Sequence, residues 1–222
     1  MMKPSGSCVG WSTSGVDKNV RSYYFVFMAK GTETRERILQ HAMAIASEVG
    51  FEGLSIGGLA KTAEMSKSGL FAHFDSKEDL QIQVLAAARR SFVENVVAPS
   101  IREARGEPRI RALFERWLTW EEGRVTPGGC PFVTASHEYD DRPGLVRDAV
   151  VAAQREWVEA IATATQIAMD EGHFRSDLDT ENFAFELYGI FLSFHLYFRL
   201  LNDPESRQRA RTAFERLIES SR

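Results

Sequence analysis

The chain has 222 residues, of which 44% are hydrophobic and 26% are charged, and its formal net charge is −4. This length suits one or two domains with a substantial core, and the slightly acidic balance excludes a protein that coats nucleic acid through overall positive charge. No apolar run approaches the ~20 residues that span a bilayer, and no apolar secretory signal follows Lys3. We therefore expect a cytoplasmic protein with reduced thiols.

Residues 1–27 differ from the rest of the chain. The first twenty, MMKPSGSCVGWSTSGVDKNV, are rich in Gly, Ser and Thr and have no helical period, which predicts disorder. The apolar burst RSYYFVF follows, and Met28 then begins MAKGTETRERIL, which is typical of a natural protein start. We expect residues 1–27 to be a disordered extension upstream of a natural start at Met28. The alternative is a genuine N-terminal arm.

The next segment predicts three helices, two of them short. The first begins at Thr32 or Glu33, carries apolar residues at helical spacing and ends at Gly50, a C-cap position. Ser55 and Ser66 are suited to cap the second and third helices. Two short helices joined by a tight turn form a helix-turn-helix, in which the second one is the recognition helix.

The rest of the chain also predicts helices, and no strand pattern or internal repeat is present. A fourth helix is capped by Ser76, runs to about Val97 and stops at Pro99. Further helices are expected at 108–122, 131–139, 144–170 and 180–202, and from Pro204 onward. The fold class is therefore all-α with about nine or ten helices, an N-terminal helix-turn-helix domain over residues 32–75 and a C-terminal helical domain over residues 76–222.

The helix-turn-helix carries residue types that suit DNA. The serines at the two helix N-termini, Ser55 and Ser66, offer hydroxyls and free backbone N–H groups to phosphate oxygens. The positions where a recognition helix reaches base edges are Lys67, Ser68 and Gly69. The positions placed to hold the phosphate backbone are His73 and Lys77. Taken singly, the serines are helix caps and the lysines are ordinary solvated charges, so the pattern as a whole supports the DNA-binding interpretation.

Residues 34–80 resemble the DNA-binding domain of the TetR family of transcriptional regulators. The resemblance rests on TRERIL, on GFEGLSI and on SKSGLFAHFDSKEDL. It implies phosphate contacts from Ser55, Ser66, His73 and Lys77. It implies base or groove contacts from Lys67, Ser68, Gly69 and Phe71. Tyrosine is usual where this chain has Phe71, which lacks the hydroxyl that meets a phosphate but can still touch a thymine methyl group.

The C-terminal domain resembles the family's ligand-binding and dimerisation half more weakly, through GCPFVTASHEYDDRPG and RSDLDTENFAFELYGIFLSFHLYFRLL. The resemblance implies a homodimer on a palindromic operator, released by a small-molecule ligand that moves the fourth helix. Residues expected to contact the ligand are Trp117, Trp120, Phe132 and His137. Residues expected at the dimer interface are Trp157, Ile161, Leu187, Phe191, Phe194 and Phe198. The alternative for both sets is the core of a single chain.

Two other classes of function are weighed against a regulator. An enzyme is disfavoured because no nucleophile–base pair, HExxH motif or phosphate-binding glycine loop is present, and no cofactor is implied. A metal site is not expected, since Cys8 and Cys130 form no CxxC pair and the histidines are scattered. Cys130 has no basic neighbour to activate it as a redox sensor. The remaining alternative is a dimeric ligand carrier or adaptor that does not bind DNA.

Overall fold

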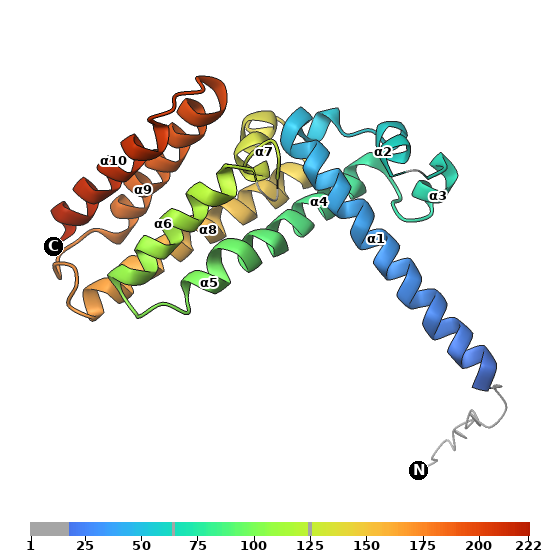
Figure 1. Cartoon of the computed structure of the whole chain (residues 1–222), viewed down its shortest axis with the longest axis horizontal. Helices are drawn as coiled ribbons and strands as arrows, with labels where there is room; N and C mark the ends of the chain where they lie inside the picture. Colours follow the sequence, from blue (N-terminus) through green and yellow to red (C-terminus); the bar gives the residue numbers. More distant parts are fainter. Residues whose placement is uncertain (1–17, 64, 124–125) are drawn as a thin grey trace, which may run out of the picture. The chain divides into compact units, whose positions relative to one another are not determined.

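The computed structural model describes residues 18–63, 65–123 and 126–222, although not the side chains of residues 18–33, 67 and 71. Within these ranges the chain is all-helical, as predicted, and has no strand (Figure 1). It divides into two units, Met1–Arg37 and Ile38–Arg222. The helices are α1 (Lys18–Gly53), α2 (Ile56–Thr62), α3 (Lys67–Phe71), α4 (Lys77–Phe92), α5 (Ala98–Ser100), α6 (Glu107–Glu121), α7 (Pro131–Tyr139), α8 (Leu145–Asp170), α9 (Thr180–His195) and α10 (Ser206–Ser221), with π-helical turns η1 (Val93–Val97) and η2 (Leu196–Leu200).

Helix α1 begins earlier than the sequence predicts. It starts at Lys18, so residues 18–27, which were expected to be disordered, are helical, and the expected start at Thr32 or Glu33 is wrong. Extending an existing helix costs less than nucleating one, and no proline interrupts this stretch. Residues 1–17 lie outside the described ranges. The predicted end of the helix is confirmed, because Gly50 has φ 79° and ψ 168°, which breaks the helical path before Phe51.

The short helices α2 and α3 pack on the C-terminal part of α1 through a shared apolar core. The largest fully buried side chains of this region are Phe51, Leu54, Leu59, Leu70 and Phe74. The turn between the two helices is closed by the Met65 N–H, which donates to the Ala60 carbonyl at 2.9 Å. This core fixes α3 on the body of the second unit, and it confirms that Phe74 is a core residue.

Helix α4 runs without interruption through η1 into α5, so Pro99 does not stop the helix near Val97 as expected. Pro99 lies in the first turn of α5, and the helical path ends at Ser100. A proline ring removes a backbone donor and crowds the preceding turn, and the wider π-helical turn before it relieves that crowding. The result is one long connecting helix from the helix-turn-helix into the larger domain (Figure 1).

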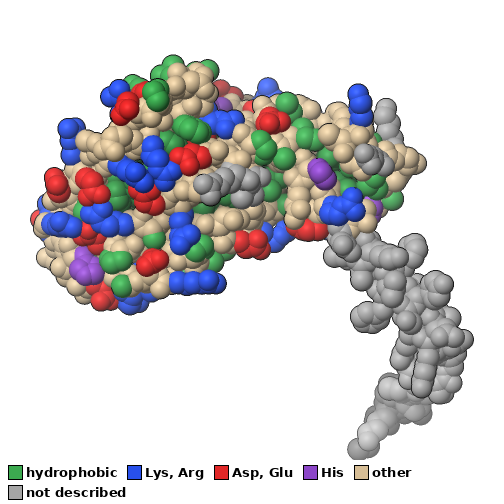
Figure 2. All heavy atoms as spheres, viewed as in Figure 1, with side chains coloured by type: hydrophobic (Ala, Val, Ile, Leu, Met, Phe, Trp, Pro, Cys, Tyr) green, Lys and Arg blue, Asp and Glu red, His purple; other side chains and the backbone are tan. Residues whose placement is uncertain are grey.

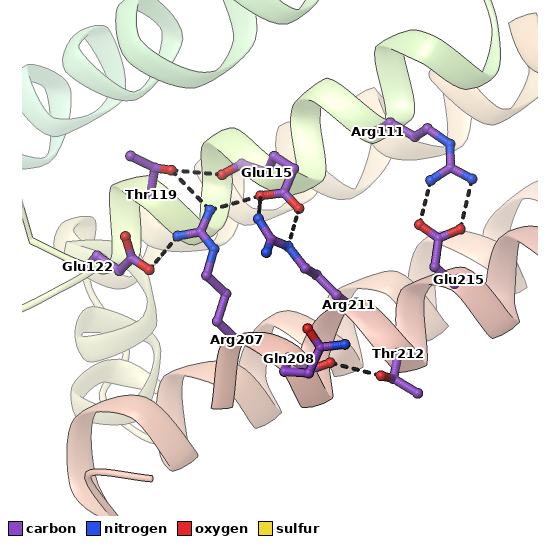
Figure 3. A network of polar contacts seen from close by, with 9 residues as sticks. All are labelled: Arg111, Glu115, Thr119, Glu122, Arg207, Gln208, Arg211, Thr212 and Glu215. Atoms are coloured by element: carbon purple, nitrogen blue, oxygen red, sulfur yellow. Dashed lines mark hydrogen bonds and ion pairs between the residues drawn. The ribbon is translucent and has the colours of Figure 1, made fainter. Parts of the chain in front are cut away.

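Helix α10 is held on α6 by paired charges, which Figure 3 shows from close by. Arg111 donates through two nitrogens to the Glu215 carboxylate, and Arg211 makes a similar pair of bonds to Glu115 at 2.7 and 2.8 Å. These bonds lower the pKa of both carboxylates below their ordinary range. Bidentate arginine–carboxylate pairs that form a network are stronger than isolated surface ion pairs. They therefore add to the contacts of α10 with α9 in holding α10 in place.

Each helix within residues 18–63, 65–123 and 126–222 is either too short or too polar to cross a membrane. On the face drawn in Figure 2, acidic and basic side chains are interspersed, so neither positive nor negative charge dominates that face.

Candidate nucleic-acid interface and effector cavity

Helix α2 begins at the predicted cap. Ser55 has an extended backbone, and its Oγ accepts a hydrogen bond from the Gly58 N–H at 3.0 Å. Its side chain is exposed, so the hydroxyl can still meet a phosphate. A Cβ added at Gly58 would lie 2.9 Å from this Oγ. Gly58 therefore leaves room for the cap itself, which gives the glycine a structural reason beside any approach of DNA.

Helix α3 repeats the same construction. The Ser66 Oγ accepts from the Gly69 N–H at 3.0 Å and lies 3.1 Å from the Ser68 Oγ. Ser66 and Ser68 are both exposed, so the first turn of the recognition helix presents two hydroxyls together. A Cβ at Gly69 would sit 3.1 Å from the Ser66 Oγ, tighter than an ordinary contact. A side chain at this position would therefore press on the capping hydroxyl, which glycine avoids.

The remaining predicted DNA contacts are placed differently. The backbones of Lys67 and Phe71 belong to α3, but their side chains lie outside the described residues. His73 directly follows the helix, and its backbone N–H donates to the Leu70 carbonyl at 2.9 Å. Its ring is partly exposed and tilted against the ring of Phe74, with the centroids 6.4 Å apart. The predicted DNA-contact roles of these residues stay predictions.

Lys77 is engaged within the protein. Its Nζ donates to the Glu52 carbonyl at 2.8 Å and forms an ion pair with the Glu52 carboxylate at 3.2 Å. Lys77 is the first residue of α4, and Glu52 lies in the last turn of α1, where backbone carbonyls lack helical partners. The predicted phosphate contact of Lys77 therefore requires this pair to open or to be shared.

The ion pair belongs to a larger polar cluster, which we name the Glu52 junction. Its members are Phe51, Glu52, Lys77, Gln81, Glu138 and Tyr139. The Phe51 N–H donates to the Glu138 carboxylate at 2.7 Å, and the Phe51 carbonyl accepts from Gln81 at 2.8 Å. The Tyr139 hydroxyl donates to Glu52 at 2.8 Å. Both backbone groups of Phe51 are thus bound by side chains, one from α4 and one from α7.

Electrostatics in the junction follow from these bonds. The hydrogen bond from Tyr139, helped by Lys77, lowers the pKa of Glu52 below its ordinary value of 4.5. Partial burial and the Glu52 carboxylate raise the pKa of Tyr139 above its ordinary value of 10.0. Glu52 is therefore ionised and Tyr139 is a neutral donor at neutral pH.

A second contact joins the larger domain to α1. The Gly128 N–H donates to the Ser47 Oγ at 2.9 Å. A Cβ at Gly128 would fall 1.8 Å from the Ser47 carbonyl oxygen, so only glycine fits between the loop and the helix backbone. The sequence analysis named none of these contacts. The contacts from Gly128, Glu138 and Tyr139 join residues 81 to 87 positions apart, and their local signal was limited to the glycine pair of the TPGGCP stretch.

The larger domain contains a cavity of about 490 Å3, partly open to solvent, between α4, η1, α6, α7, α8 and α9. Its walls are mainly apolar and aromatic, and two of the predicted ligand residues, Trp117 and Phe132, line it. Trp120 does not line the cavity, because it is buried edge-to-face against Phe92 with the ring centroids 5.6 Å apart. His137 does not line it either, since its Nδ1 lies 2.8 Å from the Val133 carbonyl.

The cavity walls hold few polar groups. Tyr188 donates to the Gln154 side-chain carbonyl at 2.8 Å, and the Gln154 amide donates to the Phe132 carbonyl at 3.2 Å and to the Ser136 Oγ at 2.7 Å. Burial raises the pKa of the Cys130 thiol to about 12, so this cysteine is inert, as expected. Among the described residues no group of His, Cys, Asp and Glu could hold a metal ion.

Both the helix-turn-helix region and the larger helical domain match models of known protein families. Residues 38–84 match the family model of bacterial regulatory proteins of the tetR family, and residues 106–214 match that of the tetracyclin repressor-like C-terminal domain. The chain belongs to the TetR family of transcriptional regulators. It is thus a DNA-binding regulator rather than an enzyme.

Individual TetR-family proteins resemble the chain at moderate identity. The transcriptional repressor NemR of Escherichia coli (strain K12) is 28% identical over 145 residues, which cover 63% of this chain and 71% of NemR. The repressor DhaR of Mycobacterium sp. (strain GP1) is 23% identical over 149 residues, 66% of this chain and 73% of DhaR. A crystal structure of a TetR regulator from Chloroflexus aurantiacus J-10-FL is 26% identical, covers 86% of this chain and 95% of that chain, and has a TM-score of 0.77.

TetR-family regulators act as dimers, but most of the residues predicted for the dimer interface belong to the core of one protomer. Five of them are buried within one protomer and leave no surface for a partner: Trp157, Ile161, Leu187, Phe191 and Phe194. The sixth, Phe198, is partly buried and stacks on Phe194 with the ring centroids 5.3 Å apart. The sequence correctly predicted the apolar stripe, but this stripe packs in the core of one protomer.

A second stripe on α9 and η2 remains open. Its large apolar side chains are exposed at successive spacings of seven, four and four residues, as a second face of the helix requires: Phe185, Leu192, Leu196 and Leu200. Phe185 and Leu200 are 76% and 71% exposed. This outer stripe of one protomer is thus free for a partner.

Proposed function

We propose that the chain is a homodimeric repressor, acting in the cytoplasm, that holds a palindromic operator until a small molecule enters the cavity. One observation supports this most directly: a single unit carries the serine-capped helix pair and the aromatic cavity, and the Glu52 junction ties the two together. The match to the tetR family and the similarity to the repressor NemR also support the proposal.

In this proposal the recognition surface is the first turn of α3 with its flanks. The positions that meet phosphates are Ser55, Ser66 and His73. The positions that meet base edges or groove walls are Lys67, Ser68, Gly69 and Phe71. Lys77 joins the phosphate contacts only if its ion pair with Glu52 is shared with DNA. Contacts to phosphate fix the orientation of the protein, and contacts to base edges give the sequence specificity.

The dimer in this proposal forms through the outer stripe of α9 and η2 together with the groove between α9 and α10. That groove is lined by Ile190, Tyr197, Ala213 and Leu217 among others, and it offers room for side chains of a second copy. A two-fold dimer presents two recognition helices to successive major grooves, about 34–36 Å apart, which is why the operator is expected to be palindromic.

The effector acts in this proposal through α7 as well as through the fourth helix. Phe132 and Val133, at the start of α7, line the cavity, and Glu138 and Tyr139, at its end, bind Phe51 and Glu52. A ligand that shifts α7 therefore disturbs the groups that hold the end of α1. The ligand changes operator affinity only as far as it binds the two states of the protein unequally.

The test is fluorescence anisotropy of the full chain with labelled DNA from upstream of its own gene, across a salt series. Saturable, sequence-selective binding with a negative log–log salt slope is expected, since phosphate contacts release counterions. Replacing Lys67 and His73 by alanine should abolish selective binding, whereas Arg175→Ala, in the loop after α8, should leave it unchanged.

The rival function is a dimeric ligand carrier or adaptor that ignores DNA. It predicts that the Lys67 and His73 variants behave like the parent protein in every assay. If no fragment of the whole genome is retained by the full chain, the regulator proposal fails and the carrier replaces it.

A further inference from the structure

We propose that the effector of this cavity is an uncharged aromatic alcohol or phenol whose hydroxyl group binds Gln154. This inference rests on the proposed function, since it names the ligand class of the same cavity. It is carried by the shape of the walls, the position of the charged residues and the unused hydrogen-bonding capacity of the polar groups.

The walls favour flat, apolar ligands. Aromatic side chains from five helices line the cavity: Phe92, Trp117, Phe132, Trp157 and Tyr188. Phe92 and Trp157 meet edge-to-face with the ring centroids 4.9 Å apart, which fixes both rings as rigid surfaces. A volume of about 490 Å3 lies within the range of ordinary small-molecule pockets. Aromatic ligands pack on such rings through stacked and edge-to-face contacts.

The charged side chains of the cavity are balanced in sign. Four of them border the cavity: Arg89, Arg109, Glu156 and Glu159. Arg89 is already paired with Glu156 at 2.6 Å, and both side chains are more than half exposed. The two positive and two negative groups therefore offer no net charge to a ligand, and the Arg109 Nε already donates to the Glu103 carbonyl at 3.1 Å.

The interior itself disfavours charge. Burial raises the pKa of both the Cys130 thiol and the Tyr188 phenol to about 12, so both groups are neutral at physiological pH. A ligand carboxylate or ammonium would meet the same loss of hydration with no fixed charge to compensate it. The cavity should therefore select against charged ligands.

The polar groups that remain open are acceptors. Both Gln154 amide hydrogens are in use, on the Phe132 carbonyl and the Ser136 hydroxyl. The Gln154 carbonyl oxygen accepts one bond from Tyr188 and has a second lone pair free. A ligand that donates a hydrogen bond uses this lone pair, whereas a ligand that only accepts finds both amide donors occupied.

Trp157 supplies the wall next to Gln154 with its ring and not with its N–H group. The Trp157 indole N–H is buried and has no acceptor among the described residues. Trp157 stands three positions after Gln154 on α8, so the two side chains share a helix face. The ring thus contributes an apolar surface beside Gln154, and the hydroxyl group of the ligand is held by the open acceptor on Gln154.

The experiment compares three ligands of one shape in displacing the neutral fluorophore N-phenyl-1-naphthylamine from the full chain at pH 7. They are 4-tert-butylphenol, 4-tert-butylanisole and 4-tert-butylbenzoate, which differ only in the head group. We expect the phenol to bind about 2- to 10-fold more tightly than the anisole, the gain typical of one hydrogen bond. The benzoate should bind more weakly than both.

Variants locate the contact. Gln154→Leu should remove the advantage of the phenol over the anisole while leaving anisole affinity within about 2-fold. Tyr188→Phe removes a donor to Gln154 but leaves its carbonyl open, so the advantage should persist. His137→Gln, outside the cavity, is the matched polar control. Thermal melting of each variant shows whether it is folded.

Three results would overturn the inference. They are a benzoate affinity equal to or above that of the phenol, an equal phenol advantage in Gln154→Leu and the parent, and no displacement by the phenol at all. Operator binding is measured separately. A chain that prefers the phenol but binds no DNA refutes the regulator and leaves the ligand class standing. A chain that binds its operator but does not bind the phenol refutes the proposed ligand class and leaves the regulator standing.

Discussion

The contact between Gly50 and Glu138 gives the sharpest energetic prediction. A Cβ at Gly50 would lie 1.9 Å from the Glu138 Oε1, so Gly50→Ala has to displace the carboxylate that binds the Phe51 N–H. The two positions should therefore be strongly non-additive. Gly50→Ala and Glu138→Ala each break the same hydrogen bond, and the double variant can break it only once.

The magnitudes follow from the geometry. Losing a hydrogen bond between a carboxylate and a buried N–H costs about 1.5–3 kcal/mol. The backbone of Gly50, at φ 79° and ψ 168°, lies in a region used almost only by glycine, which adds about 1–3 kcal/mol to the cost of alanine there. The double variant should then cost about 1.5–3 kcal/mol less than the sum of the single variants.

Urea unfolding followed by tryptophan fluorescence measures the cycle, at one protomer concentration because dimers gain stability with concentration. Gly172→Ala is the matched control, since Gly172 has φ +72° and open space around its missing Cβ. Its cost should add to that of Glu138→Ala within about 0.5 kcal/mol. Equal additivity in the Gly50 cycle would refute the claim that the carboxylate is held against this glycine.

Three further predictions follow from the same contacts. Tyr139→Phe removes the hydrogen bond that lowers the pKa of Glu52, so it should reduce the free energy of unfolding by about 1 kcal/mol at pH 7. This reduction should shrink as the pH falls below 4.5 and Glu52 becomes protonated. Urea unfolding at a series of pH values measures it, and a reduction that does not depend on pH would contradict the reasoning. Lys67→Ala should weaken operator binding by about 1–3 kcal/mol in an anisotropy titration and relax specificity, and unchanged specificity would count against a base contact. Leu196→Arg, in η2, should turn the dimer into a folded monomer, as measured by light scattering. Leu145→Arg, at an exposed apolar position at the start of α8, should leave the dimer intact. A dimer that persists in Leu196→Arg would place the interface on another surface.

The helix-turn-helix was predictable because its signals are local. Ser55 and Ser66 cap their helices through N–H groups only three residues further on, and Gly50 ends α1 by its own backbone conformation. Each feature is decided within one turn of helix, so the order of residues alone determines it. The family resemblance was carried by these same positions.

The junction and the dimer face were not predictable in the same way. Glu138 and Tyr139 meet Phe51 and Glu52 across 87 positions of sequence, and nothing nearby in the chain specifies that pairing. The apolar period of α9 shows that two faces exist, but which face the protomer buries depends on α6, α8 and α10. His137 failed as a cavity residue for a similar reason, since one step along α7 turns a side chain by more than a quarter of a circle.

The two ends of α7 differ in how firmly they are held, and this favours the proposed coupling. At its start, the Cys130 N–H donates to Glu121 at 2.9 Å, and this fully buried carboxylate also binds the His195 ring at 2.7 Å. At its end, Glu138 binds the Phe51 N–H at 2.7 Å, and Tyr139 binds Glu52, whose side chain is 44% exposed, so that water competes for this bond. A fully buried carboxylate is costly to separate from its hydrogen-bond partners, whereas a bond to an exposed side chain is readily exchanged for one to water. A ligand pressing on Phe132 should therefore leave the start of α7 in place and move its far end, where the helix meets the end of α1.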